Sequence, residues 1–412
     1  MAAKNDIATI VTYETGKPLV EALGEVNYAL GFVWWFSGEA ERAQGTVGYS
    51  AIPNRRTITN KQPVGVSVAL VPWNLPVAMI LRKASAALAA GCTMIIKPSP
   101  ETPLSVLALV ELAVRAGFDK GVLTVMTTDL QCTPSLSEGL CKHPLVRKVT
   151  FTGSTRIGKL ISHHCSDGLK KLTLELGGNC PFVVFDDADV GKAVDALMQL
   201  KWHHTGQACI TANRVYVQKG IYDEFQRLFV ERTKQLKIGH GAVDGTTLGP
   251  LTTPGGVDKV EAHVQDAISH GGRIALGGTR PSHGSGFFYP ATVISEANDK
   301  MLVAAEETFG PLCALFRFGT EDEAVGYANN TSLGLASYVF TRDVSRIWRL
   351  LERLEAGMVG LNTGNQSAAE LPFGGIKESG YGKESGKDIA INEYLITKSA
   401  TLTVDEVASV KL

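Results

Sequence analysis

Four short apolar segments, separated by helical stretches, most constrain what this chain can fold into. They are Val64–Val71, Cys92–Ile96, Val122–Met126 and Arg147–Phe151. Short apolar runs that alternate with helical periodicity are typical of βαβ units, in which helices bury both faces of a parallel sheet. The pattern therefore predicts an α/β fold built on a twisted parallel sheet.

The helical stretches carry the expected end signals. One spans about Ala78–Ala90, and the next opens near Pro103 and stops at Gly117. Proline favours the first turn of a helix and glycine favours the position after its last turn. Further along, a strand-like run at Phe182–Phe185 and helical spacing over Val257–His270 predict a second α/β unit.

The flanking segments differ from these two units. Asp6–Phe36 is predicted to be helical, and the aromatic cluster Trp34–Phe36 at its end is predicted to pack in the core. Thr46–Gln62 alternates like a pair of strands, and the tail from Ile389 reads as an edge strand. Pro281–Gly286 has the composition of a surface loop.

Size and charge narrow the class of protein. With 412 residues the chain exceeds what one hydrophobic core usually organises, so we expect two or more domains. The formal net charge of -1 gives no electrostatic reason to bind nucleic acid or an anionic membrane. The seven cysteines lack the density of a disulfide framework, and the N-terminus lacks a secretory or transit pattern, so we expect a cytoplasmic protein.

The segment Lys201–Thr211 contains the best candidate nucleophile, Cys209. A thiolate is a strong nucleophile, and Gly206 nearby lets an electrophile approach the backbone. The ordinary alternative for a free cysteine is packing in the core. Upstream, Glu175 lies among apolar residues and precedes Gly177–Gly178. Because a carboxyl group in an apolar setting has a raised pKa, Glu175 is a candidate base.

The segment Phe151–Lys159 ends one predicted strand and opens a helix. Backbone N–H groups at such a place can bind a phosphate. The spacing imitates a P-loop, but Leu160 stands where a P-loop needs Ser or Thr to hold Mg²⁺. The alternatives that remain are a dinucleotide-binding turn and a tight turn with no ligand.

Five motifs together are more specific than any one of them. They are Pro72–Pro76, Phe151–Ser154, Leu174–Gly178, Lys201–Thr211 and Glu306–Pro311. In this order and spacing they resemble the aldehyde dehydrogenase superfamily along almost the whole chain. The residues within these motifs are most similar to those of succinate-semialdehyde dehydrogenases of fungal type. The resemblance implies an aldehyde dehydrogenase fold, with parallel-sheet cofactor and catalytic domains and a small β oligomerisation arm.

The resemblance also implies a mechanism for three catalytic residues. Cys209 would attack the aldehyde, and the Asn74 side chain with the Cys209 backbone N–H would stabilise the oxyanion. After hydride transfer, Glu175 would activate the water that releases the acid. Without the resemblance, Asn74 fits a turn residue equally well.

By resemblance the cofactor is NADP or NAD. Nine residues are expected at its site: Pro72, Trp73, Lys97, Ser99, Gly153, Ser154, Gly158, Glu307 and Phe309. Pro100 stands where NAD-preferring relatives carry a glutamate for the ribose hydroxyls, so repulsion against a 2′-phosphate is removed. Read alone, Lys97 and Glu307 are solvated charges and Phe309 is a core residue.

Three residues are expected to bind the substrate. Arg82 and Ser367 match positions that hold the distal carboxylate in succinate-semialdehyde dehydrogenases. His203 stands where a second arginine is expected, and histidine lacks the bidentate fork and is only partly charged near neutrality. We expect no metal site, because the adjacent His203 and His204 rarely aim at one ion.

The predicted domains follow from these assignments. Residues 1–43 and 63–177 form the dinucleotide-binding domain, and 178–387 form the catalytic domain. Residues 44–62 and 388–412 form the bridging strands, which imply a homo-oligomer, a dimer or a tetramer. Resembling chains carry more sequence before Met1, so we expect an N-terminally incomplete cofactor domain. The alternatives are a catalytically silent homologue, or an enzyme for a different short semialdehyde.

Overall fold

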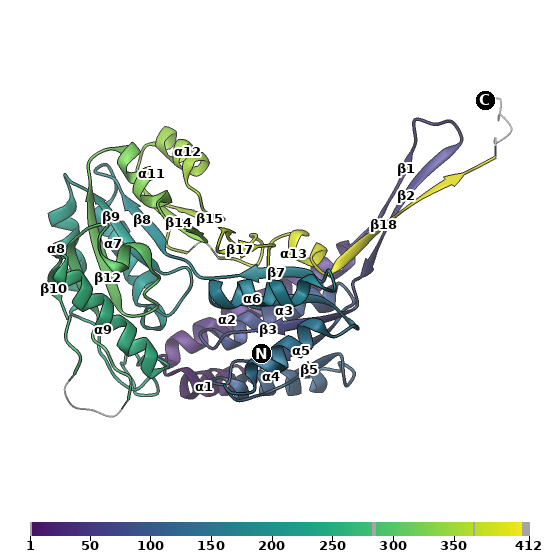
Figure 1. The fold of residues 1–412 in the computed structure, drawn as a ribbon, viewed down its shortest axis with the longest axis horizontal. Coiled ribbons are helices and arrows are strands. Elements are labelled where there is room, and N and C mark those ends of the chain that lie inside the picture. The colour runs from purple at the N-terminus through teal and green to yellow at the C-terminus, as the bar shows by residue number, and fades with distance from the viewer. Residues whose placement is uncertain (1, 282–285, 366, 406–412) are drawn as a thin grey trace.

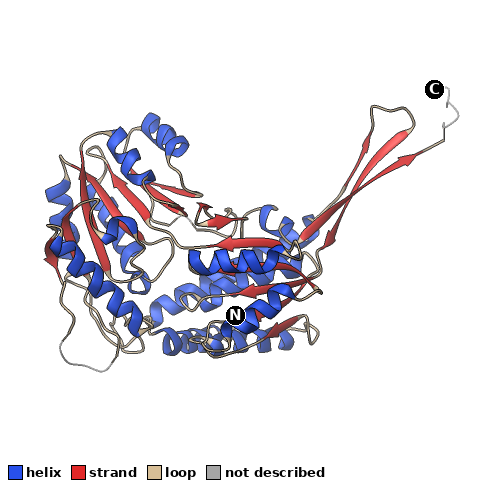
Figure 2. Cartoon of the chain, in the orientation of Figure 1, coloured by secondary structure: helices blue, strands red, loops and turns tan. Residues whose placement is uncertain are grey.

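The computed structural model describes residues 2–281, 286–365 and 367–405. These residues form two helix-covered sheets and a three-stranded arm that projects away from them (Figure 1). The strands of each sheet lie between layers of helices (Figure 2). Residues 282–285 of the predicted loop and 406–412 of the predicted tail lie outside the described residues.

The first sheet has six strands in the order β17-β7-β6-β3-β4-β5. Its strands are β3 (Val66–Leu70), β4 (Thr93–Lys97), β5 (Leu123–Val125), β6 (Val146–Thr152), β7 (Lys171–Glu175) and β17 (Gly380–Tyr381). The first five are parallel and β17 is antiparallel to β7. This arrangement confirms the predicted parallel sheet and the α/β fold class.

Helices cover both faces of the first sheet. They are α1 (Lys4–Thr15), α2 (Leu19–Glu39), α3 (Pro76–Ala89), α4 (Pro103–Arg115), α5 (Thr133–Lys142) and α6 (Thr155–Ser166). Alternate residues of β3 point to opposite faces of the sheet and pack in different cores. Ala69 packs with α2 and α3, while Val68 and Leu70 pack with α5 and α6.

The second sheet has seven strands in the order β10-β11-β12-β9-β8-β14-β15. They are β8 (Cys180–Val184), β9 (Ala212–Gln218), β10 (Arg273–Leu276), β11 (Thr292–Ala297), β12 (Leu312–Phe318), β14 (Ala336–Phe340) and β15 (Met358–Leu361). All pairings are parallel except β10 with β11. This is the predicted second α/β unit.

The second sheet is also covered on both faces. Its helices are α7 (Val190–Trp202), α8 (Tyr222–Thr233), α9 (Pro254–Ser269), α10 (Leu302–Ala305), α11 (Glu321–Asn329) and α12 (Val344–Arg353). Phe182 packs with α7 and α8, and its neighbour Val183 packs with α9, α11 and α12. A two-stranded ribbon of β13 (Leu333–Gly334) and β16 (Ile376–Lys377) leads back toward β17.

The arm consists of β1 (Thr46–Tyr49), β2 (Arg55–Pro63) and β18 (Leu395–Thr403), paired antiparallel in the order β1-β2-β18. Its hairpin follows the short helix η1 (Ala40–Arg42). The arm stands clear of the body (Figure 1), and every residue of β18 except Leu395 is exposed. The strand pair predicted at Thr46–Gln62 is therefore confirmed.

Two predictions about the flanking segments were wrong. Phe36 is buried in the core, but Trp34 is 77% exposed, because it lies on the solvent side of α2. The tail does not begin as a strand: Ile389–Asn392 forms the short helix α13 before β18. None of the helices in the described part of the chain is both long and apolar enough to cross a membrane.

Candidate active site

Cys209 and Glu175 meet between the two sheets. Glu175 ends β7, and Cys209 lies in the loop that joins the short helix η2 (His203–Gly206) to β9. The Cys209 thiol donates a hydrogen bond to Glu175 Oε1, with the sulfur 3.5 Å from the oxygen. Gly178 makes this approach possible, since a Cβ there would lie 2.4 Å from the Cys209 carbonyl oxygen.

The loop before Cys209 has an unusual backbone. His204, Thr205 and Gly206 all have positive φ, of 46°, 57° and 75°. A Cβ at Gly206 would lie 2.2 Å from the carbonyl oxygen of Gly310, so glycine is required at that position. Consecutive left-handed residues turn the chain sharply and bring Cys209 to the surface of two cavities.

Three charged side chains form a buried network with Glu175. Arg82 and Lys83 come from α3, and Glu384 comes from the segment after β17. Arg82 Nη1 lies 3.3 Å from Glu175 Oε2 and 3.8 Å from Glu384 Oε2. Lys83 Nζ donates to Glu384 at 2.5 Å and to Thr152 Oγ1 at 2.6 Å. Thr152 Oγ1 in turn donates to Glu175 Oε2 at 3.1 Å.

This network gives the carboxyl groups of Glu175 and Glu384 very different pKa values. Burial, with the charge of Glu384, raises the pKa of Glu175 to about 7. Burial opposes ionisation of Glu384 as well, but Lys83 and the hydrogen bond to Glu175 bring its pKa down to about 2. Glu384 is therefore ionised at neutral pH. Glu175 exchanges a proton there, which suits a general base.

The surroundings of Cys209 favour the protonated thiol. Burial and the neighbouring carboxyl groups Glu175 and Glu307 raise its pKa well above the ordinary value. A thiol in this setting reacts only when a base removes its proton. The sulfur must therefore lose this proton before it can attack a substrate.

Asn74 lies beside the loop that carries Cys209. Its side chain is buried, and Nδ2 donates to the Gln207 carbonyl at 3.0 Å. Gln207 is two residues before Cys209, so this bond ties the loop after β3 to the cysteine loop. An amide has two N–H donors, and the second is available for a developing oxyanion.

Two cavities meet at Cys209. The first has a volume of about 240 Å³ and is lined by six of the residues predicted at the cofactor: Pro72, Trp73, Gly153, Ser154, Glu307 and Phe309. The second has a volume of about 360 Å³ and is lined by all three residues predicted at the substrate, Arg82, His203 and Ser367. Cys209 lines both cavities.

The comparisons with known proteins agree with this arrangement. The sequence profile of the "Aldehyde dehydrogenase family" matches residues 1–400. The chain belongs to the aldehyde dehydrogenase family. It is an NAD(P)-dependent aldehyde dehydrogenase, as its motifs predicted.

Individual relatives carry narrower names. "Succinate-semialdehyde dehydrogenase [NADP(+)] 1" of Schizosaccharomyces pombe is 49% identical over 98% of this chain and 80% of its own length. "Glutarate-semialdehyde dehydrogenase" of Pseudomonas putida is 48% identical over 97% of this chain and 82% of its own. The crystal structure of an "E. coli NADP dependent enzyme" is 46% identical and superimposes with a TM-score of 0.95, over 97% of this chain and 82% of that one.

The remaining predicted cofactor residues of this aldehyde dehydrogenase lie outside the first cavity. Lys97 ends β4 and is buried, not solvated, and burial lowers its pKa. Ser99 follows it and donates to the carboxylate of Glu101. Gly158 is a packing residue of α6, since a Cβ there would lie 2.4 Å from Leu176 Cδ2. Its smallness is explained without a ligand.

Residue type alone predicts that Glu307 is a solvated charge and that Phe309 is a core residue, but their surroundings in the structure are different. Glu307 Oε1 accepts a hydrogen bond from the Gly178 N–H at 3.2 Å, and burial raises its pKa to about 7. Phe309 has a positive φ of 53°, and its ring meets Trp73 edge to face at 5.6 Å. Both side chains line the first cavity.

The side chains of the adjacent His203 and His204 have different surroundings. His203 lines the second cavity with its Nδ1 3.8 Å from Glu21 Oε1, while the His204 ring packs against Trp73 at 6.0 Å. Within the described ranges, no group of three or more His, Cys, Asp or Glu side chains has the geometry to hold a metal ion.

Three residues of the site were not singled out from the sequence. Lys83 and Glu384 complete the buried charge network, and Tyr28 lines the second cavity, donating or accepting a hydrogen bond with Ser367 Oγ. The charged pair Arg82–Lys83 inside the otherwise apolar helix α3 was an available signal. Nothing local in the sequence marks Glu384 or Tyr28.

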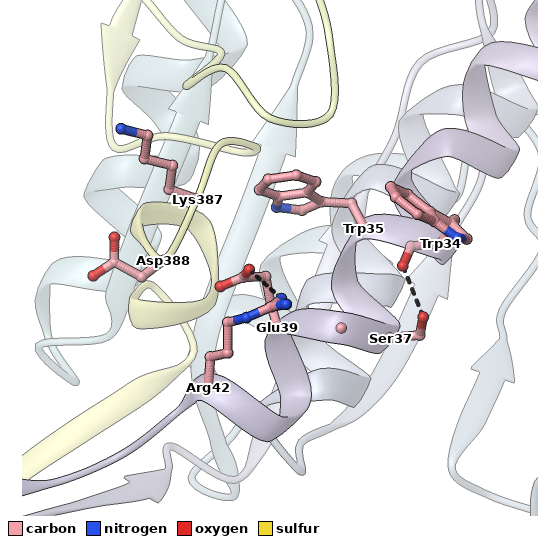
Figure 3. Close-up of a pocket in the computed structure, with 8 residues that line it drawn as sticks. Trp34, Trp35, Ser37, Glu39, Arg42, Lys387 and Asp388 are labelled. Carbon is pink, nitrogen blue, oxygen red and sulfur yellow. Dashed lines mark hydrogen bonds and ion pairs between the residues drawn. The ribbon is translucent and has the colours of Figure 1, made fainter.

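A larger cavity, of about 580 Å³, lies at the end of α2 beside α13 and is lined by both neighbouring tryptophans, Trp34 and Trp35. Figure 3 shows Arg42 paired with Glu39, at 3.0 Å, and Lys387 opposite the indoles. It shares no lining residue with the two cavities at Cys209.

Proposed function

We propose that the protein oxidises succinate semialdehyde to succinate, with Cys209 as the nucleophile. One observation carries this proposal: Cys209 lies at the junction of two cavities, one with the cofactor motifs and one with the carboxylate-binding candidates. The names of the fungal and bacterial relatives support a dicarboxylic semialdehyde. Glutarate semialdehyde, one carbon longer, is the alternative that a bacterial relative supports.

Each catalytic side chain has one task in the proposed reaction. The Cys209 thiol loses its proton to solvent, and Sγ forms a bond to the aldehyde carbon. The Asn74 amide and the Cys209 backbone N–H donate to the resulting oxyanion. The bound nicotinamide supplies the hydride acceptor, and reformation of the carbonyl leaves a thioester on Cys209. Glu175 then takes a proton from water, which attacks the thioester and releases the acid and the thiol.

The residues around the first cavity fit a nicotinamide dinucleotide. Ser154 caps the N-terminus of the twelve-residue helix α6, whose first turn contains no acidic residue. A helix N-terminus of this kind favours a diphosphate. Lys97 ends β4, which lies next to β3, and Ser99 follows it, at the carboxyl edge where open α/β sheets bind nucleotides. We propose NADP or NAD, and Pro100 favours acceptance of a 2′-phosphate.

The second cavity supports binding of a distal carboxylate through three side chains. The Arg82 guanidinium stacks over Phe373 at 3.9 Å and donates to the Tyr28 hydroxyl at 3.4 Å. Tyr28 in turn contacts Ser367. We propose that Arg82, Tyr28 and Ser367 share the carboxylate, since donors grouped in this way form charge-assisted hydrogen bonds to it.

His203 contributes less charge than its residue type indicates. Burial lowers its pKa to about 4, with Lys17 adding to the effect. From the sequence we expected His203 to be partly charged near neutrality, whereas partial burial of the ring favours its neutral form. His203 remains in the proposed substrate site as a neutral lining residue.

We propose a homo-oligomer and the three-part domain division given by the sequence. The exposed arm supports the first point, because two strands of it, β1 and β18, have open edges and outward apolar residues such as Val47, 78% exposed, and Ile396, 45% exposed. The two separate sheets support the second, although β17 pairs with the first sheet while lying in the stretch assigned to the catalytic domain.

Seven cysteines without a disulfide among the described residues support a cytoplasmic location, which cell fractionation would test.

Two substitutions test the mechanism. Cys209→Ala should abolish NAD(P)H formation from succinate semialdehyde while the melting temperature stays near that of the wild type. Glu175→Gln should keep a fast first burst of NAD(P)H and then turn over roughly 10²–10⁴-fold more slowly, because water activation loses its base. Stopped-flow absorbance measures both phases. Turnover by Cys209→Ala would contradict the proposed nucleophile.

Tyr28→Phe tests the substrate assignment. It removes one hydroxyl from the carboxylate site, so KM for succinate semialdehyde should rise roughly tenfold, as expected for one charge-assisted hydrogen bond. KM for butanal, the uncharged analogue, should not change. An equal response of both aldehydes would show that the cavity does not read the carboxylate.

The arm can be tested by adding charge to it. Val47→Lys together with Ile396→Lys should lower the mass measured by light scattering, because exposed lysines on strand edges oppose pairing. Leu169→Lys, at a site 91% exposed and outside the arm, is the matched control and should leave the mass unchanged. A wild-type protein that is monomeric at every concentration would refute the assembly.

A further inference from the structure

A fully buried ion pair lies behind the loop that carries Asn74. Lys17 Nζ is 2.6 Å from Glu25 Oε2, and neither side chain is exposed at all. Lys17 Nζ also donates to the backbone carbonyl of Asn74 at 2.8 Å. A buried ion pair persists when its further donors and acceptors are satisfied, and here a second N–H of the Lys17 ammonium group is directed at the main chain of Asn74.

The other oxygen of Glu25 fixes the helix that follows Asn74. Glu25 Oε1 accepts from the N–H groups of Val77 and Ala78 at 2.9 and 3.2 Å. These groups lie in the first turn of α3, whose N-cap residue, Leu75, makes no side-chain hydrogen bond. A carboxylate from α2 therefore supplies the cap that α3 lacks.

The pair itself is held by main-chain packing. Lys17 follows Gly16, which has a φ of 79°, at the junction of α1 and α2. A Cβ at Gly241 would lie 2.2 Å from the Lys17 carbonyl oxygen, so the 239–249 segment lies directly against this junction. The Leu19 N–H donates to the Gly241 carbonyl at 3.0 Å. The Lys17 ammonium group thus extends from a fixed backbone.

Asn74 is consequently restrained at both ends. Lys17 holds its carbonyl, and its side chain donates to the carbonyl of Gln207, two residues before Cys209. The Gln207 side chain is itself held, because its Oε1 accepts from the Thr252 N–H at 3.0 Å. An oxyanion donor acts through its position, and a displacement of about 1 Å can cost about 10²-fold in rate.

We propose that Lys17, with Glu25, is a positioning pair that sets the place of the Asn74 amide relative to the oxyanion formed at Cys209. Lys17 touches neither substrate nor cofactor in this proposal and acts on the reaction through Asn74, while Glu25 also lines the second cavity. The inference rests on the proposed oxyanion role of Asn74. It adds a requirement for the junction of α1 and α2, which contains none of the catalytic motifs.

The test compares double variants, because Lys17→Met alone would leave the Glu25 carboxylate buried without a cation. The variant Lys17→Met/Glu25→Gln removes both charges and keeps an amide oxygen to cap α3. Its burst of NAD(P)H should be about tenfold slower than that of the wild type, with cofactor affinity by fluorescence titration unchanged. The burst reports the half-reaction in which the oxyanion forms.

Coupling to Asn74 distinguishes positioning from general loss of structure. Asn74→Ala alone should slow the burst about 10²–10³-fold, and adding Lys17→Met/Glu25→Gln should slow it no further. Lys148→Met is the matched control: Lys148 is a buried lysine that donates to Thr173 at 2.6 Å and touches no part of Asn74. Any effect of this control on the burst should multiply with that of Asn74→Ala.

Each outcome decides a separate point. A burst at the wild-type rate in Lys17→Met/Glu25→Gln, or a tenfold effect that multiplies with Asn74→Ala, would overturn the positioning pair and leave the proposed function intact. A wild-type burst in Asn74→Ala itself would overturn the oxyanion role of Asn74, and the inference with it. A slow, non-multiplying burst supports the pair.

Discussion

The buried contact between Arg82, Lys83, Glu175 and Glu384 is the interaction on which the rest of the site depends. Two cations and two carboxyl groups, each at most 5% exposed, occupy one cluster. Removing one member would leave an unpaired buried charge, at a cost of about 3–5 kcal/mol. The cluster joins α3, the end of β7 and the segment after β17, so the same contacts that hold the base also hold these three elements together.

The cluster also determines how the base behaves. Because Glu384 takes the close contact with Lys83, it stays ionised and raises the pKa of Glu175 beside it. Arg82 partly opposes that effect and also lines the second cavity. A single guanidinium therefore links the acidity of the base to the proposed substrate site. A carboxyl group that titrates near neutrality can take a proton from the attacking water and return it to the departing sulfur.

The sequence predicted the parts of the site that are local and missed those that are tertiary. Cys209, Glu175 and Asn74 lie in motifs with a recognisable spacing, and the structure brings them together. Glu384 lies 209 residues after Glu175, in a segment whose pairing with β7 no local pattern reveals.

Three other predictions differ from the structure because they also depend on tertiary packing. Gly158 fits a phosphate-binding turn by spacing, but its Cβ position is filled by Leu176, the residue after β7. His203 has the residue type of a partial charge, but burial lowers its pKa. Trp34 has the residue type of a core position, but it lies on the exposed side of α2. Burial is a property of the assembled fold, and residue type alone does not determine it.

The most direct measurement of the central claim is the mass of the peptide that contains Cys209. Glu175→Gln would be mixed with succinate semialdehyde and cofactor, quenched in acid, digested and analysed by mass spectrometry. Our interpretation predicts a succinyl group on Cys209, because the thioester forms and its hydrolysis lacks the base. An unmodified Cys209, or a succinyl group on another residue, would contradict it.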